Sequence, residues 1–206
     1  MCRKEFRIVN DVACANFVIH RGVFTAGEII ATAIFSLTPF RSADDTVDLC
    51  RTDERELRYA WPGAVRCNIG GEYSPDGLKF DRFAPDFPDK SRHISAKYYG
   101  IRSHNGTPYG TAGVFWKFFH MDILRDFSCP EDRLKDAAVM VDAWMIEGVD
   151  ARELSLAGYN IQMSISDALE IFNDPGNATT DEHFLQACIM AQHVLARRIS
   201  TIINTF

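Results

Sequence analysis

The sequence predicts an α/β fold, with a mainly parallel sheet flanked by helices and a helical C-terminal part. Short apolar runs alternate with amphipathic stretches between residues 16 and 81, and apolar residues recur at helical spacing between residues 110 and 206. The composition, 47% hydrophobic and 24% charged, is that of a globular protein. We expect one domain overall, in which residues 1–109 form the α/β core with a long loop over 82–109, and residues 110–206 form a helical part packed on the same core.

Strands and helices alternate in the first part of the chain. Apolar or alternating runs predict strands over residues 17–20, 46–50, 64–69 and 79–81. Helical spacing predicts a helix over 27–37, which stops before Pro39, and the charged segment 53–60 predicts a short helix. The residues Ser-Pro-Asp-Gly at 74–77 predict a turn. This alternation implies right-handed crossovers, and hence a mainly parallel sheet.

The C-terminal part carries helical patterns. Small residues followed by aromatic ones predict a helix over 111–119. Capping boxes, at Ser128 with Glu131 and at Thr179 with Glu182, predict the starts of two further helices. The last helix then presents an apolar face, with residues spaced three or four apart: Phe184, Cys188, Ala191, Leu195, Ile199 and Ile202.

Charge and cysteine usage bear on partners and location. Lys and Arg number 22 and Asp and Glu number 28, so the net charge is −6 and the whole protein lacks the positive field that most non-specific nucleic-acid binders use. No stretch reaches the ~18 apolar residues that a membrane span needs, and the N-terminus has no apolar segment typical of a signal peptide. The six cysteines have no paired spacing. We therefore expect reduced thiols in a cytoplasmic protein with no membrane partner.

Polar residues stand at the predicted ends of the strands, where open α/β sheets bind their ligands. These residues are His20, Arg51, Asn68 and Asp81. His20 is either a metal ligand or a strand-end histidine satisfied by hydrogen bonds to the backbone. Asp81 either binds a cation or holds its loop to the sheet.

The glycine pair that follows the third predicted strand has two interpretations. Gly70 and Gly71 can let a phosphate approach the backbone, as glycine-rich loops do. They can equally form a tight turn that demands positive φ. The sequence leaves both open.

Five short motifs follow one another along the chain: His-Arg-Gly-Val-Phe-Thr-Ala-Gly-Glu at 20–28, Arg-Thr at 51–52, Asn-Ile-Gly-Gly-Glu-Tyr-Ser at 68–74, Phe-Asp-Arg-Phe at 80–83 and Thr-Ala-Gly-Val-Phe-Trp at 111–116. In order and spacing they resemble the melanocyte-proliferating-gene family, which belongs to the DHH superfamily of metal-dependent phosphoesterases. The resemblance covers most of the chain and implies a DHH-type core. Members are usually longer, so it also implies that their C-terminal portion is missing from this sequence.

The resemblance implies a two-metal centre, which in the family holds two divalent ions, typically manganese, with His and Asp side chains. His20 and Asp81 are the expected ligands that remain. The other ligand positions hold residues other than His or Asp, namely Thr25, Gly27, Asn68, Arg82 and Phe83. Two ions bring four positive charges, so two remaining ligands are too few to hold them.

The resemblance also places two arginines, Arg51 and Arg82, near the crevice. They can bind an anion such as phosphate, or they lie in solvent or in salt bridges. The binding candidates are therefore Arg51, Asn68, Gly70, Gly71 and Arg82. The segment 90–104 adds basic residues interleaved with tyrosines, which suits either single-stranded nucleic acid or a charged loop without a ligand.

From these substitutions we expect a divergent family member with a degraded metal site. It would act without a cofactor as a non-catalytic binding or assembly module, whose partner is a protein, a nucleotide or nucleic acid; a homo-oligomer is compatible with the sequence. The alternative is a metal-dependent phosphodiesterase or exonuclease that uses Mn or Mg in a rebuilt active site. There His20 and Asp81 would act with replacements such as Glu28, Glu72, Asp76 or His104.

Overall fold

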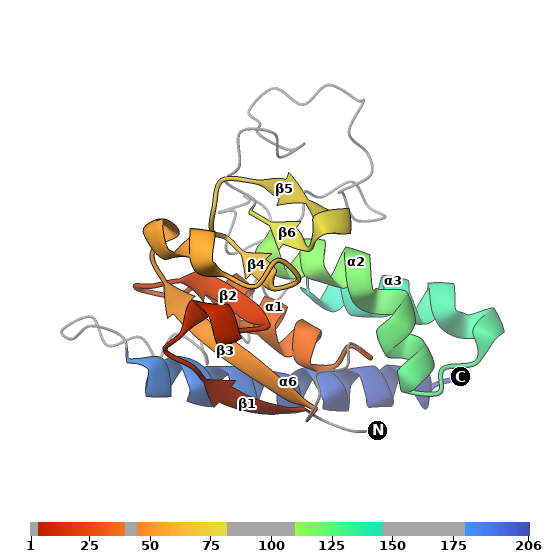
Figure 1. The fold of residues 1–206 in the computed structure, drawn as a ribbon. Coiled ribbons are helices and arrows are strands. Elements are labelled where there is room, and N and C mark those ends of the chain that lie inside the picture. The colour runs from red at the N-terminus through yellow and green to blue at the C-terminus, as the bar shows by residue number, and fades with distance from the viewer. Residues whose placement is uncertain (1–3, 40–44, 82–109, 146–179) are drawn as a thin grey trace, which may run out of the picture.

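Six strands form one sheet in the computed structural model, which describes residues 4–39, 45–81, 110–145 and 180–206 (Figure 1). The strands are β1 (Glu5–Ile8), β2 (Phe17–His20), β3 (Thr46–Thr52), β4 (Val65–Cys67), β5 (Tyr73–Ser74) and β6 (Lys79–Phe80). The α-helices are α1 (Ala26–Ser36), α2 (Thr111–Asp126), α3 (Leu134–Met145) and α6 (Asp181–Ile203). Short 3₁₀ helices are η1 (Val12–Cys14), η2 (Glu54–Tyr59), η3 (Pro75–Gly77) and η5 (Glu131–Arg133).

The sheet has the order β1-β3-β2-β4-β6-β5, and all neighbours run parallel except β5 and β6. The central strand β2 is buried on both faces over Phe17–Ile19, as its continuous apolar run requires. The residues that end β2 and β3, His20 and Thr52, are register partners. The structure thus confirms the predicted α/β fold with a mostly parallel sheet and flanking helices.

The main core lies between one face of the sheet and the helices α1, α2, α3 and α6. Aromatic rings fill its centre: Phe115 of α2 lies 4.5 Å from Phe80 and 5.9 Å from Phe17 between ring centroids. All three side chains are at most 2% exposed, and burying a phenylalanine contributes about 1.5–3 kcal/mol. The apolar face predicted for the last helix is buried in this core.

A second and smaller apolar cluster lies on the opposite face of the sheet, beneath η1 and η2. Alternation along the strands separates the two clusters. On β4, Val65 and Cys67 belong to the main core, whereas Arg66 between them is only half buried. This second face is therefore partly open, because only short helices and loops cover it.

Several local predictions need correction. The strand β1 was not predicted, and the short helix expected over residues 53–60 is a 3₁₀ helix. Ser128 has φ +60° and caps no helix, and α6 is capped by Thr180 instead of Thr179. The predicted loop over 82–109 lies outside the described residues. Within the described part of the chain, no helix is both long and apolar enough to cross a membrane.

Candidate functional site

The carboxyl ends of four parallel strands meet at one edge of the sheet. His20 ends β2, Thr52 ends β3, Asn68 follows β4 and Asp81 follows β6. Because β2, β3, β4 and β6 are parallel neighbours, the predicted strand-end residues lie along a single edge. The turn after β2 leads directly into α1, so the first residues of that helix lie at the same edge.

The first turn of α1 is held by a capping box between Thr25 and Glu28. The Thr25 hydroxyl accepts from the Glu28 backbone N–H at 3.2 Å, and Glu28 Oε2 accepts from the Thr25 backbone N–H at 2.8 Å. Glu28 is only 1% exposed. The cap therefore delivers a carboxylate to the edge of the sheet and buries it there.

His20 lies next to this buried carboxylate. Its Nε2 is 2.8 Å from Glu28 Oε1, and its Nδ1 is 3.1 Å from the backbone oxygen of Arg21. Both partners are acceptors, so both ring nitrogens donate and the imidazole is favoured in its protonated form. While both contacts hold, neither ring nitrogen keeps a lone pair for another ligand.

Asn68 completes the cluster from the end of β4. Its Nδ2 donates to Glu28 Oε1 at 3.0 Å and to Thr111 Oγ1, at the start of α2, at 2.9 Å. Its φ of +51° lies in the left-handed region, which asparagine tolerates better than most residues. One amide group thus links the edge of the sheet to two helices. We name His20, Thr25, Glu28, Asn68 and Thr111 the strand-end cluster.

The contacts within the strand-end cluster set its protonation. The hydrogen bond to Glu28 raises the pKa of His20 above its usual value, although partial burial of the ring acts against this. Burial acts to raise the pKa of the Glu28 carboxyl, but the hydrogen bond and charge of His20, with hydrogen bonds from Asn68 and Thr25, bring this pKa below its usual value. Imidazolium and carboxylate therefore stabilise each other.

The Arg51 side chain is buried and contacts other residues of the protein. Its side chain is 1% exposed and pairs with Asp181, at the start of α6, at 3.1 Å. It also donates to the Gly22 carbonyl, and its guanidinium lies over the rings of Phe24 and Phe184, 5.7 and 5.1 Å from their centroids. Arg51 thus joins β3 to the loop after β2 and to the last helix.

Asp81 closes the glycine turn. Its Oδ2 accepts from the Gly71 backbone N–H at 2.8 Å, and the carboxylate is 4% exposed. Gly70 and Gly71 have φ of +95° and +62°, which explains why glycine is needed at both positions. The tight-turn interpretation therefore accounts for this glycine pair. Arg82 lies outside the described residues.

The residues considered for a rebuilt site have different surroundings. Glu28 is beside His20, whereas Glu72 pairs with Lys79 at 2.8 Å and Asp76 is exposed on η3. His104 lies outside the described residues. In the segments that the structure describes, no group of three or more His, Cys, Asp or Glu side chains is arranged to hold a metal ion.

Comparison with known families supplies the identity. A family sequence model described as "Uncharacterised protein family (UPF0160)", the MYG1 exonuclease model, matches residues 16–206. The chain belongs to the melanocyte-proliferating-gene family. No curated protein and no solved structure matches the chain at a significant level. Membership makes it a DHH-like protein of an exonuclease family, as the order of its motifs had suggested.

Sequence reasoning missed two parts of this family member's strand-end cluster. Thr25 was treated only as a lost ligand, although Thr-x-x-Glu before an apolar run is a capping-box signal. Thr111 starts a predicted helix and belongs to one of the five family motifs, but no pattern in the sequence links it to Asn68, 43 residues earlier. The hydrogen bond between Asn68 and Thr111 depends on how α2 packs against the sheet.

Proposed function

We propose that this protein is a non-catalytic binding or assembly module built on a DHH-like core whose ancestral metal site has been replaced. The observation that carries the proposal is the internal satisfaction of Glu28. This carboxylate accepts hydrogen bonds from Asn68 and from the Thr25 backbone, and it pairs with His20. A metal ligand must instead offer its lone pairs outward.

Charge balance supports the same conclusion. Two divalent ions need several anionic or imidazole ligands, because unneutralised charge in a partly buried site is costly. His20 supplies a positive charge to the strand-end cluster when it is protonated, and Glu28 neutralises it. Asn68 contributes an amide where the family has an aspartate. The cluster is neutral without a metal, and added cations would disturb that balance.

Hydrolysis of a short single-stranded RNA in the presence of Mn²⁺ tests this proposal. We expect the full chain to release no nucleotides above a control without protein. Mn²⁺-dependent hydrolysis that disappears in His20→Ala and persists in His193→Ala would overturn the proposal. His193 is an exposed histidine on α6, so its substitution controls for the loss of any imidazole.

Mn²⁺-dependent hydrolysis in this assay would support the alternative, a metal-dependent phosphodiesterase with a rebuilt site. One observation favours that enzyme: His20 and Glu28, both of ligand type, lie 2.8 Å apart at the edge where Asp81 also stands. Mn²⁺ or Mg²⁺ would then be its cofactor. To bind an ion, the pair would have to exchange its mutual hydrogen bond for metal coordination.

A further inference from the structure

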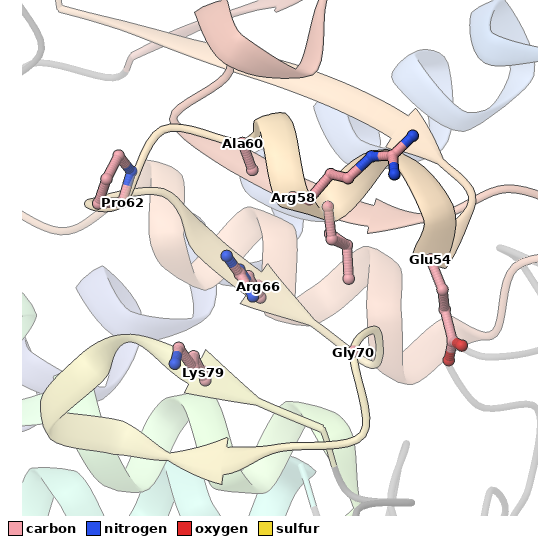
Figure 2. A pocket seen from close by; sticks show the side chains of 8 residues that line it. Glu54, Arg58, Ala60, Pro62, Arg66, Gly70 and Lys79 are labelled. Carbon is pink, nitrogen blue, oxygen red and sulfur yellow. The ribbon is translucent and has the colours of Figure 1, made fainter.

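An open cavity of about 550 Å³ lies on the second face of the sheet, away from the main core (Figure 2). Residues of η2 and the following loop form one side, and β4, the turn at Gly70 and β6 form the other. It is separate from the strand-end cluster, none of whose residues lines it. Its size is within the range of pockets that hold small organic ligands.

Positive charge predominates in the lining of this cavity. Arg58, Arg66 and Lys79 contribute cations, and Glu54 contributes the one carboxylate among the lining residues. This local excess occurs on a chain whose net charge is −6. Such a concave basic surface attracts anions even when the whole protein repels them.

Two of these cations lie on adjacent strands of the sheet and on the same face. Arg66 of β4 and Lys79 of β6 are register partners, so their side chains leave the same face side by side. Like charges directly opposite one another are destabilising. Glu72 offsets Lys79 through contacts of 2.8 Å, but no ion pair in the described part of the chain includes Arg66. An anion beside Arg66 would supply the counter-charge that Glu72 supplies to Lys79.

Arg58 lines the cavity from η2, but its guanidinium points away from Arg66 and Lys79 (Figure 2). Its Cζ lies 4.6 Å from the centroid of the Tyr59 ring. Planar guanidinium groups bind phosphate through two parallel hydrogen bonds. The cavity therefore offers one such group, that of Arg66, beside the ammonium group of Lys79.

The remaining lining gives the cavity an apolar wall. Leu57 and Ala60 belong to the smaller apolar cluster, and both are buried. Gly70 has φ +95°, and a Cβ placed there would lie 3.0 Å from Leu57 Cδ1, so the space depends on glycine at this position. A cationic rim beside an apolar wall suits a ligand with an anionic group on a larger organic body.

We propose that this cavity binds a phosphorylated small molecule of nucleotide size, with the phosphates held by Arg66 and Lys79. The inference goes beyond the proposed function, because it concerns the opposite face of the sheet and does not depend on whether the strand-end cluster is catalytic. The shared chemistry is a phosphate group, carried either by a nucleotide or by a free polyphosphate.

Calorimetric titration of the full chain with ADP, and separately with inorganic pyrophosphate, tests this site. EDTA in the buffer removes any binding that depends on divalent metal. We expect ADP to bind, and Arg66→Gln and Lys79→Gln each to weaken binding by about tenfold, since a hydrogen bond to a charged group is lost. Arg55→Gln is the matched control, because Arg55 lies on η2 but does not line the cavity. We expect this variant to bind ADP with the same affinity as the unmodified protein.

The two titrations distinguish the sources of the phosphate. Tighter binding of ADP than of pyrophosphate assigns the cavity to nucleotides, and equal or tighter binding of pyrophosphate assigns it to free polyphosphates. Failure of both ligands to bind, or binding that neither substitution weakens, overturns the proposal. Lys79 is only half buried, so Lys79→Gln still provides the test if Arg66→Gln fails to fold.

Discussion

His20 and Glu28 show how the same residue types serve either metal binding or structure. Each residue carries donor atoms that metals use, yet in this fold the imidazole donates to the carboxylate at 2.8 Å and to a backbone oxygen at 3.1 Å. The direction of the donor atoms, rather than the identity of the residues, decides what such a pair can bind. Because the contact shifts the pKa values of both groups, its contribution to stability should depend on pH.

The ion pair predicts a defined pH window for its contribution to stability. The pKa of His20 is raised above 6.5, so its contribution is complete below pH 6.5 and is lost as the pH rises through the higher folded value. The pKa of Glu28 is lowered below 4.5, so its contribution is present above pH 4.5 and is lost as the pH falls through the lower folded value. The pair therefore contributes most to the free energy of unfolding between pH 4.5 and pH 6.5.

Urea unfolding of the unmodified protein and of Glu28→Gln across this range measures the effect. We expect the difference in the free energy of unfolding to be largest between pH 4.5 and 6.5 and to shrink on both sides. Glu182→Gln, an exposed glutamate in the first turn of α6, is the control and should show no such window. A difference for Glu28→Gln that is constant with pH would contradict the ion pair.

Asn68 allows the charge of the strand-end cluster to be tested with little change in shape. Aspartate tolerates the φ of +51° about as well as asparagine, so Asn68→Asp changes the charge and not the backbone. It would set a second carboxylate about 3.0 Å from Glu28 Oε1. We expect a loss of about 1–3 kcal/mol in unfolding free energy at neutral pH with EDTA present, and a smaller loss in acid. Asn10→Asp, at an exposed position, should be near neutral; an equal loss there would refute the argument.

Among the elements, α1 depends on its N-terminal cap. The Thr25 hydroxyl accepts from the Glu28 backbone N–H, and the helix it begins is buried on almost every side. We expect Thr25→Ala to lower the free energy of unfolding by about 1 kcal/mol, measured by urea denaturation. Thr201→Ala is the control, because its hydroxyl bonds only within α6 and is exposed. Equal losses for the two variants would show that the cap is unimportant.

Most elements of the sheet could be predicted because their patterns are local. The buried run at Phe17–His20 and the apolar segment before Pro39 are visible without any partner. In contrast, β1 has alternating exposed and half-buried residues over only four positions, and it becomes a strand by pairing with β3. Such an edge strand depends on its partner more than on its own sequence.

The error at Ser128 has a physical cause. Its spacing to Glu131 fits a capping box, but Ser128 adopts φ +60° where α2 ends, and its backbone N–H bonds to the Arg125 carbonyl. A left-handed residue just after a helix is a C-terminal stop. Pro130 then precedes η5, and α3 starts at Leu134. The Ser-x-x-Glu pattern therefore marks the end of α2 and not the start of a helix.

At the scale of the whole molecule, the sequence located the edge of the site but not its contacts. Parallel strands bring His20, Asn68 and Asp81 to one edge, and this followed from strand order alone. Whether their polar atoms face outward or one another depends on how α1 and α2 pack on the sheet. The links from Asn68 to Thr111 and from Arg51 to Asp181 join residues 43 and 130 positions apart, beyond the reach of local patterns.

Titration calorimetry of the full chain with Mn²⁺ is the most direct test of the central claim that the strand-end cluster is satisfied by its own hydrogen bonds. The contacts of Glu28, His20 and Asn68 predict no tight binding of two ions per chain. Tight binding of two Mn²⁺ ions that is lost in His20→Ala and retained in His193→Ala would contradict it.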